Sequence, residues 1–271
     1  MAAIPCTDNL TLSGIALFLD VDGTLLEIAA RPQAVSVPEA LRERLQALSR
    51  ASGGAVALIS GRKIADLDAL FAPLALPSAG LHGFERRSAS GGYGRLPPPS
   101  TAALEFARDA MTQLAREHAG LLVEDKQFAL AVHYRDAPQL ENTVVRTMQE
   151  LAKHVHEDLE LQRGKMVVEL RPAGATKAHG VAAFLEEAPF VGRVPIFIGD
   201  DLTDEPAFEL VNQRDGFTAV VSPARPSAAR ARFNDVTSVH RWLEQLQAAP
   251  AAALRRLSAR KLEIARGGSL A

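Results

Sequence analysis

The sequence contains a single cysteine, Cys6, among 271 residues, and only 5% of its residues are aromatic. One cysteine cannot form an intrachain disulfide or a thiolate metal cluster, so we expect a reducing, cytoplasmic compartment. No apolar run approaches the roughly 20 residues of a membrane-spanning helix, and the start of the sequence lacks the pattern of a signal peptide. The formal net charge is −2. Without a basic surface field, we expect neither nucleic acid nor a membrane as a partner.

The rest of the composition is that of an ordinary globular protein. Hydrophobic residues make up 47% of the chain and charged residues 23%, and the length suits one large domain or two smaller ones. Short apolar runs, typical of buried strands, alternate with helical patterns near both ends of the chain. This alternation predicts a doubly wound α/β core, with strands at 15–19, 55–59, 194–198 and 217–221 and helices at 38–50, 66–71, 176–185 and 236–246.

The middle of the chain follows a different pattern. Residues 88–99 are rich in Ser, Gly and Pro, which indicates a linker. Helical patterns follow at 101–118, with Ser100 as the expected N-cap, and from Pro138 onward. Two short strands are expected within 121–135, and a hairpin at 159–170 with its turn at Arg163-Gly164. We therefore predict an inserted α+β domain at 100–171, with two helices on a small antiparallel sheet, and a discontinuous core at 1–99 and 172–271.

The first predicted strand ends in two carboxylates, Asp20 and Asp22, followed by Gly23 and Thr24. Ligands of open parallel sheets bind beyond the carboxyl ends of the strands, and side chains two residues apart on an extended segment face the same side. Backbone N–H groups of the Gly-Thr segment can point at an anion. An acidic turn without further function fits this motif equally well. An EF-hand loop does not fit, because that loop places its glycine at position 6.

Further polar groups follow, or lie near, the ends of other predicted elements: Ser60, Lys177, Asp200 and Asp204. In a doubly wound sheet such groups can converge on one edge. Clustered carboxylates would repel one another unless a hard cation such as Mg²⁺ lay among them. A cation, a lysine, a hydroxyl and turn amides together can stabilise a phosphoryl group in transfer.

In that arrangement Asp20 would act as the nucleophile and Asp22 as the acid/base. Each further group has a simpler explanation when it is taken alone. Ser60 can cap a helix, Lys177 can be solvated, and Asp200 can belong to an N-cap cluster. The joint pattern, in this order along the chain, is much less frequent by chance.

The predicted insert carries polar pairs on its strands. Glu124 and Lys126 project from one strand face, and so do Glu169 and Arg171. Such a face can hydrogen-bond the many hydroxyls of a disaccharide, but a solvated sheet face explains the pattern about equally well. His133 can line the cleft or pack against the helices.

The motifs Asp-Val-Asp-Gly-Thr-Leu, Ser-Gly-Arg, an isolated lysine before a helix, and Gly-Asp-Asp-x-Thr-Asp-Glu resemble those of the haloacid dehalogenase (HAD) phosphatases. From Leu17 to Trp242 the chain is similar, more narrowly, to the trehalose-6-phosphate phosphatase family. The segments Glu124-Asp125-Lys126 and Glu169-Leu170-Arg171-Pro172 carry that narrower resemblance. One departure is Ala178, where the family usually has Gly after the lysine, and it puts in question the close helix packing beside Lys177.

The resemblance implies a HAD core with an α+β cap, and Mg²⁺-dependent hydrolysis of trehalose 6-phosphate through an aspartyl-phosphate. It implies the following roles: catalysis by Asp20 and Asp22; phosphate binding by Gly23, Thr24, Ser60, Gly61 and Lys177; substrate binding by Arg62, His82, Glu124, Lys126 and Glu169; and metal binding by Asp20, Asp22, Asp200 and Asp204.

Three other functions stay open. The substrate can be another sugar phosphate, such as sucrose 6-phosphate or mannosyl-glycerate phosphate. The chain can be a non-catalytic sugar-phosphate sensor, although binding alone needs no acid/base beside a nucleophile. It can also be a structural partner of a synthase, and as an enzyme it can be coupled functionally to a trehalose-phosphate synthase. A Rossmann dehydrogenase is disfavoured, because no G-x-G-x-x-G follows the first predicted strand.

Overall fold

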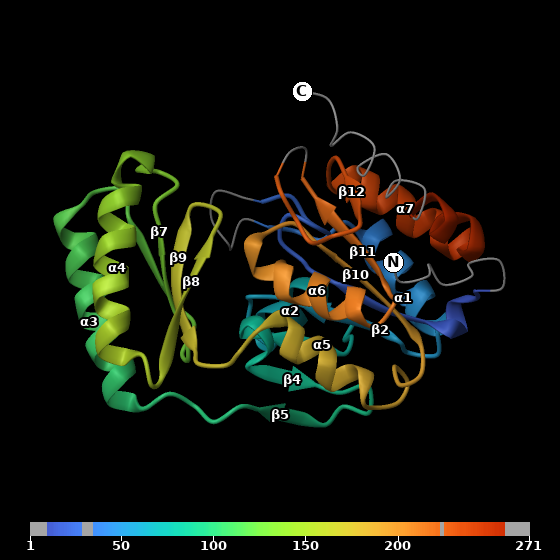
Figure 1. Cartoon of the computed structure of the whole chain (residues 1–271), viewed down its shortest axis with the longest axis horizontal. Helices are drawn as coiled ribbons and strands as arrows, with labels where there is room; N and C mark the ends of the chain where they lie inside the picture. The colour runs from blue at the N-terminus through green and yellow to red at the C-terminus, as the bar shows by residue number, and fades with distance from the viewer. Residues whose placement is uncertain (1–9, 29–34, 223–224, 258–271) are drawn as a thin grey trace.

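The computed structural model describes residues 10–28, 35–222 and 225–257, so Cys6 lies outside the described residues. Within them the chain forms two sheets, a large one in the core and a small one beside it (Figure 1). The fold is therefore α/β with a separate α+β cap, as the sequence predicts. None of the helices in the described ranges combines the length and apolar character that a membrane crossing requires.

The large sheet has the strand order β12-β11-β10-β1-β2-β3-β4-β5. Neighbours from β12 to β3 are parallel, whereas β4 and β5 extend the sheet by antiparallel pairing. Strands β1 and β10 are adjacent in the middle of the sheet, which places their carboxyl ends side by side. The bounds are β1 (Ile15–Leu19), β2 (Val56–Ile59), β3 (Ser78–Gly80), β4 (Glu85–Arg87), β5 (Tyr93–Arg95), β10 (Val194–Gly199), β11 (Phe217–Val221) and β12 (Ala231–Phe233).

Helices cover both faces of this sheet. One hydrophobic cluster contains side chains of three helices: α1 (Glu39–Ala51), α2 (Ile64–Phe71) and α7 (Val236–Ala248). The other contains side chains of α5 (Lys177–Leu185) and α6 (Glu205–Gln213). Strand β1 contributes to both clusters, because successive side chains point to opposite faces: Leu17 joins the first cluster and Phe18 the second. Burying such a side chain stabilises the fold by about 1.5–3 kcal/mol.

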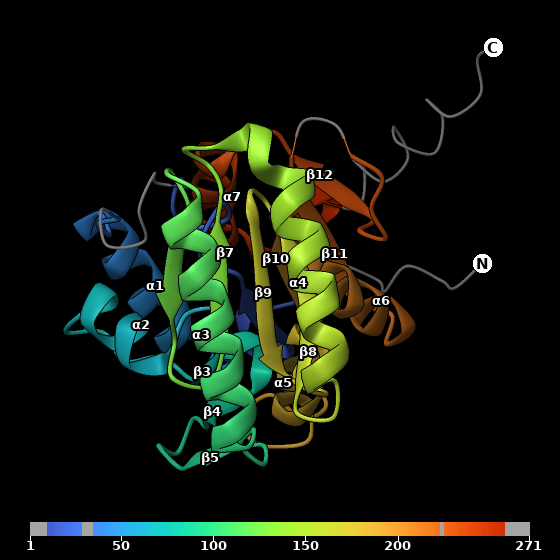
Figure 2. The same ribbon diagram turned by 90° about the vertical axis from the view of Figure 1, so that its left-hand side faces the viewer.

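The cap is built from one continuous stretch of the chain. Its sheet has the antiparallel order β6-β7-β9-β8, and its two helices cover the outer face, away from the core (Figures 1 and 2). The bounds are α3 (Thr101–Glu117), β6 (Leu122–Asp125), β7 (Leu130–His133), α4 (Glu141–Val155), β8 (Leu159–Gly164) and β9 (Val167–Pro172). The Ser100 side chain accepts a hydrogen bond from the Ala103 amide and so caps α3, as predicted.

The structure differs from the prediction at the cap hairpin. The turn lies at residues 165–166, two residues later than the predicted Arg163-Gly164 turn. Gly164 still belongs to the strand and pairs with Val167, while Met166 takes a positive φ of 62°. A Cβ on Gly164 would lie 3.0 Å from an Asp201 oxygen. The glycine therefore serves the close approach of the hairpin to the core.

The predicted linker at 88–99 also contains structure, because β5 lies within it. Strands β3, β4 and β5 are three residues long, and β5 is exposed along its whole length. Strands this short, of which β5 lies at the edge of the sheet, carry no alternation of apolar and polar residues from which they could be recognised. The sequence pattern likewise did not indicate β12 or α6.

Candidate active site

Two aspartates meet at the carboxyl ends of the central strands. Asp20 directly follows β1, and Asp200 directly follows β10, which is paired with β1 in parallel. The Asp20 amide donates to the Ile198 carbonyl (2.9 Å), which fixes the backbone at this point. Gly23 has a φ of 84°, and a Cβ there would lie 2.0 Å from an Asp200 oxygen. Only glycine fits beside that carboxylate.

A buried lysine connects this edge to the next loop. Lys177 is the first residue of α5, and its Nζ donates to Asp20 Oδ1 (2.6 Å) and to Asp204 Oδ1 (2.7 Å). Asp204 Oδ2 accepts the amides of Asp200 and Asp201, both at 2.9 Å. Thr24 Oγ1 donates to Asp20 Oδ2 (3.1 Å). The lysine and Asp204 therefore hold the two aspartate-bearing segments together.

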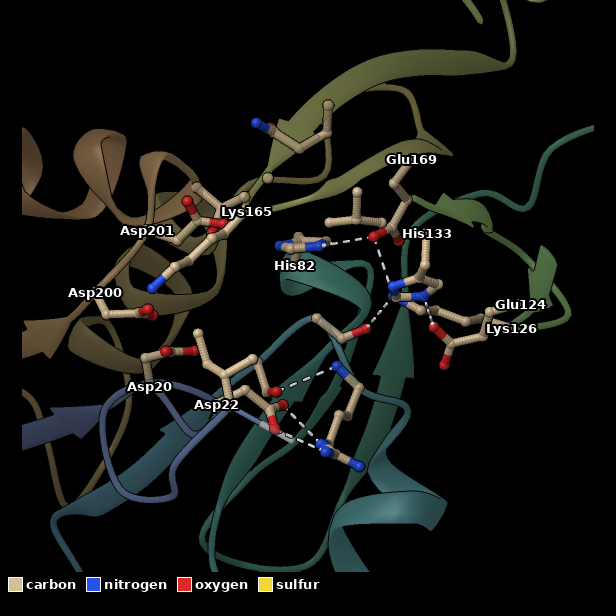
Figure 3. A pocket seen from close by; sticks show the side chains of 18 of the residues that line it. Asp20, Asp22, His82, Glu124, Lys126, His133, Lys165, Glu169, Asp200 and Asp201 are labelled. Carbon is tan, nitrogen blue, oxygen red and sulfur yellow. Dashed lines mark hydrogen bonds and ion pairs between the residues drawn. The ribbon is translucent and has the colours of Figure 1, made fainter. Parts of the chain in front are cut away.

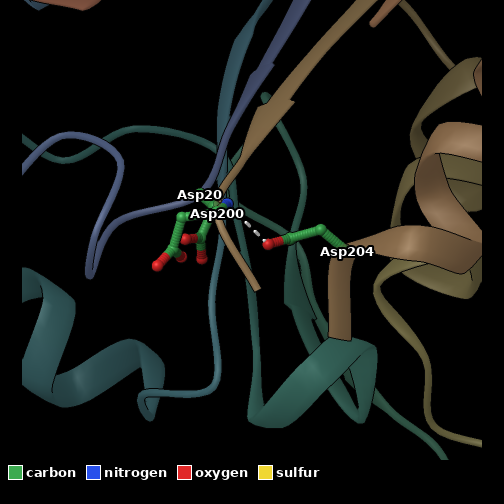
Figure 4. A group of neighbouring side chains, drawn as sticks. All are labelled: Asp20, Asp200 and Asp204. Atoms are coloured by element: carbon green, nitrogen blue, oxygen red, sulfur yellow. Dashed lines mark hydrogen bonds between the residues drawn. The ribbon is translucent and has the colours of Figure 1, made fainter. Parts of the chain in front are cut away.

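The charges of this cluster do not cancel. Ligand atoms of Asp20, Asp200 and Asp204 all lie within 4.8 Å of one another (Figure 4), and Lys177 is the ammonium that pairs with two of them. Burial raises the pKa of Asp20 to about 7, although Lys177 opposes the shift. Burial, followed by repulsion from Asp20 and Asp204, raises the pKa of Asp200 to about 9.

Burial disfavours the charge on Lys177 too, but Asp20 and Asp204 outweigh it and hold the lysine pKa above its ordinary value. The Asp200 carboxylate accepts no hydrogen bond from the described residues. A half-buried carboxylate without a donor, beside two buried ones, is a suitable environment for a hard divalent cation. The donor set of this cluster therefore fits such an ion.

The Ser-Gly-Arg segment follows β2 along the same edge. Ser60 is buried, and its Oγ accepts the Arg62 amide (3.1 Å). The Arg62 guanidinium binds the Asp22 carboxylate at both ends, with Nε to Oδ2 and Nη2 to Oδ1 at 2.7 Å each. A planar guanidinium fork fixes a carboxylate in orientation as well as in position. Asp22 is thus oriented by a residue 40 positions away in the sequence.

The cap contributes a second polar cluster, which faces the first (Figure 3). Lys126 Nζ donates to Glu169 Oε2 (3.0 Å) and to the Gly61 carbonyl (3.2 Å), so it joins cap and core. His82 Nε2 lies 3.4 Å from the same Glu169 oxygen. On the neighbouring strands, His133 Nε2 lies 2.8 Å from Glu124 Oε2.

Glu169 and His82 are buried, yet each keeps one polar atom without a partner: Glu169 Oε1 and His82 Nδ1. His82 has a φ of 57° and lies between Leu81 and Gly83, which also have positive φ. A non-glycine residue in this region is strained, and such strain is concentrated at functional sites. Both residues line the pocket described below, and these two atoms have no hydrogen-bond partner among the described residues.

Burial disfavours the ionised form of Glu169, but Lys126 and His82 outweigh it and lower its pKa to about 2. Burial opposes ionisation of Glu124 too, yet the His133 hydrogen bond and Lys126 bring its pKa below the ordinary value. In contrast, burial is the larger effect at His82 and lowers its pKa.

One pocket spans both clusters. The predicted residues that line it are Asp20, Asp22, Ser60, Gly61, Arg62, His82, Glu124, Lys126, Glu169, Lys177 and Asp200. Gly23, Thr24 and Asp204 support these residues through the contacts described above. The pocket lining that the predicted site set omitted includes His133, Arg135, Gln162, Lys165, Asp201 and Thr203. Lys165 lies in the hairpin turn, which was predicted two residues too early, and Gln162 lies on the strand that leads into it.

Comparison with known proteins identifies the fold and the family. The family model for trehalose-phosphatase matches residues 18–237. The trehalose-6-phosphate phosphatase of Escherichia coli (strain K12) is 41% identical over 246 residues, covering 90% of this chain and 91% of that protein.

Two solved structures share the fold. The C-terminal domain of a C. albicans trehalose-6-phosphate phosphatase has a TM-score of 0.80 at 24% identity, covering 87% of this chain and 92% of that one. A phosphatase of the HAD superfamily from Bacteroides thetaiotaomicron has a TM-score of 0.59 at 16% identity, covering 92% and 99%. With this fold, and with a family match over most of its length, the chain belongs to the trehalose-phosphatase family of hydrolases.

Proposed function

We propose that this protein hydrolyses trehalose 6-phosphate to trehalose and phosphate with Mg²⁺ as its cofactor. The observation that carries the proposal is the single pocket in which the carboxylate cluster of the core faces the polar strands of the cap. A phosphorylated disaccharide presents the matching chemistry, with a dianionic group at one end and many hydroxyls at the other. The 41% identical E. coli relative bears the name of that activity.

In this mechanism Asp20 attacks the phosphorus atom and forms an aspartyl-phosphate, while the sugar oxygen leaves. Asp22, oriented by Arg62, donates a proton to that oxygen and later takes one from the water that cleaves the intermediate. Lys177 supplies a fixed positive charge beside the nucleophile. Ser60, Gly61 and the amides of Gly23 and Thr24 complete the phosphate site.

Asp20, Asp200, the Asp22 carbonyl and Asp204 would hold the Mg²⁺ ion, Asp204 either directly or through water. When bound, the ion neutralises carboxylate charge and stabilises charge on the phosphoryl oxygens. Asp204 also holds the loop that carries Asp200, so it contributes to the site in either case.

At the other end of the pocket, Glu124, Lys126, Glu169 and His82 would bind sugar hydroxyls. The free atoms Glu169 Oε1 and His82 Nδ1 are an acceptor and a ring nitrogen that a hydroxyl group can satisfy. We place the cap domain at 100–171 and the core at 1–99 and 172–271. A cytoplasmic location and functional coupling to a trehalose-phosphate synthase belong to the same proposal.

A substrate panel tests the function. We expect Mg²⁺-dependent phosphate release from trehalose 6-phosphate with a kcat/KM at least about tenfold above that for sucrose 6-phosphate or glucose 6-phosphate. Equal rates on all three would remove the specificity, and binding without turnover would identify a sensor.

A variant of the cap sharpens the same test. Lys126→Met removes a charged donor, so we expect a KM for trehalose 6-phosphate raised about tenfold or more. Turnover of p-nitrophenyl phosphate, which carries no sugar, should change less than about twofold. Lys153→Met, at an exposed lysine of α4, is the matched control. An unchanged KM in Lys126→Met would mean that this lysine of the cap does not contribute to binding of the sugar.

A further inference from the structure

The tip of the cap hairpin places a lysine at the core end of the pocket. Lys165 lies in the two-residue turn between β8 and β9 and lines the same pocket as Asp20, Asp200 and Asp201. In the close-up its ammonium points toward the side where Asp200 and Asp201 lie (Figure 3). The hairpin thus brings a positive charge from the cap to the carboxylates of the core.

The turn is held in a defined position. Met166 has a φ of 62°, its side chain packs against the hydrophobic core of the cap, and its carbonyl accepts the Tyr134 amide (3.1 Å). On the other side, Gly164 lies so close to Asp201 that a Cβ would come within 3.0 Å of the carboxylate. With both neighbours anchored, Lys165 is the residue of this turn that faces the pocket.

The ammonium group of Lys165 is unpaired among the described residues, unlike those of the other two lysines of the pocket. Lys177 is bound by Asp20 and Asp204, and Lys126 by Glu169. Lys165 makes no ion pair or hydrogen bond through its ammonium with the residues that the structure describes. Its side chain is exposed, so no desolvation cost prevents it from meeting an anion.

We propose that Lys165 binds the phosphoryl group of the substrate from the cap side, opposite Lys177 and the carboxylate cluster. This inference rests on the proposed function and adds a residue to its phosphate site. A phosphoryl group that contacts both domains binds more tightly when cap and core lie together as in this structure, so its binding favours that arrangement. The cap then responds to the phosphate as well as to the sugar.

Anion binding tests the assignment without relying on turnover of the sugar phosphate. Titration calorimetry would measure binding of orthophosphate and of orthovanadate to the Mg²⁺-loaded full chain. We expect Lys165→Met to weaken both by about tenfold or more, since a charge-assisted contact to an oxyanion is lost. Lys165→Glu should weaken them further, and Lys165→Arg should stay within about threefold of the original chain.

Free trehalose provides the second arm of the experiment. Its affinity should be unchanged in Lys165→Met, because it carries no phosphate, and Lys153→Met should alter neither ligand. The weakening in Lys165→Met should also shrink at high salt, since an exposed charge is screened.

The proposal is overturned if Lys165→Met binds orthovanadate as tightly as the original chain, or if trehalose binding falls in place of anion binding. It also fails if the original chain binds neither anion, because the anion site would then be absent. Absence of trehalose 6-phosphate turnover alongside the expected anion results would refute the proposed function alone.

Discussion

The two ends of the pocket bury carboxylates under opposite electrostatic conditions. At the core end, Asp20, Asp200 and Asp204 share one ammonium, and the pKa values of Asp20 and Asp200 rise to about 7 and about 9. At the cap end, Glu169 is as deeply buried, but Lys126 and His82 lower its pKa to about 2. Burial opposes ionisation at both ends, so the difference comes from the neighbouring charges: other carboxylates raise the pKa values at the core end, whereas Lys126 and His82 lower that of Glu169.

This difference separates the tasks of the two regions. An excess of buried negative charge binds a cation and, through it, a phosphate dianion. A cluster of paired charges stays close to neutral and offers hydrogen-bonding atoms to an uncharged sugar without a strong net field. The fold provides the first at the carboxyl ends of parallel strands and the second on one face of the antiparallel cap sheet, to which the core adds His82.

The largest expected effect comes from removing the nucleophile at the core end. Asp20→Asn should lower the rate of phosphate release from trehalose 6-phosphate by about a thousandfold or more, because an amide cannot form the aspartyl-phosphate. Asp109→Asn, at an exposed position on α3, should keep the full rate. A rate in Asp20→Asn equal to that of the original chain would refute the covalent mechanism.

A smaller effect is expected from the neighbouring carboxylate. Asp200→Asn removes one charge from the cluster, so we expect the Mg²⁺ affinity, measured by titration calorimetry, to fall by about a hundredfold. A chelator should abolish turnover in the original chain, and added Mg²⁺ should restore it. If Asp200→Asn binds Mg²⁺ as tightly as Asp109→Asn does, the charge excess at the core end has another purpose than holding the ion.

The core end of this comparison was predictable from the sequence for a physical reason. A strand buried on both faces is an uninterrupted apolar run, and the first polar residue after it must lie at the sheet edge. Asp20, Ser60 and Asp200 were located in that way, and the structure brings all three to one pocket. The cap helices were also predictable, because their apolar periods are regular over several turns.

Contacts between distant segments could not be predicted. Nothing in the local sequence around Asp22 indicates that Arg62 binds it, nor does the pattern around Lys126 indicate its bond to the Gly61 carbonyl. The position of Lys165 depends on the register of one hairpin. The turn of that hairpin contains Met166 with a positive φ, a conformation that sequence-based reasoning expects of glycine. Sequence patterns locate elements, whereas the pairing of charges depends on how the elements pack.

The smallest expected effect concerns the paired charges at the cap end, whose contribution to the free energy of unfolding depends on pH. Since the pKa of Glu169 falls from the ordinary 4.5 to about 2 on folding, the unfolded chain binds more protons between these values. Stability from this group is therefore complete above pH 4.5 and is lost as the pH falls toward 2. The difference between the two pKa values corresponds to about 3 kcal/mol as an upper bound.

Glu169→Gln should thus lower the free energy of unfolding in urea by up to about 3 kcal/mol at pH 7, and by progressively less at pH 4 and pH 3. Glu105→Gln, at an exposed position on α3, should show no such trend. A deficit in Glu169→Gln that stays constant from pH 7 to pH 3 would mean that the glutamate contributes through packing alone. The contrast between the two ends of the pocket would then not depend on paired charge, because the carboxylate at the cap end would gain nothing from Lys126 and His82.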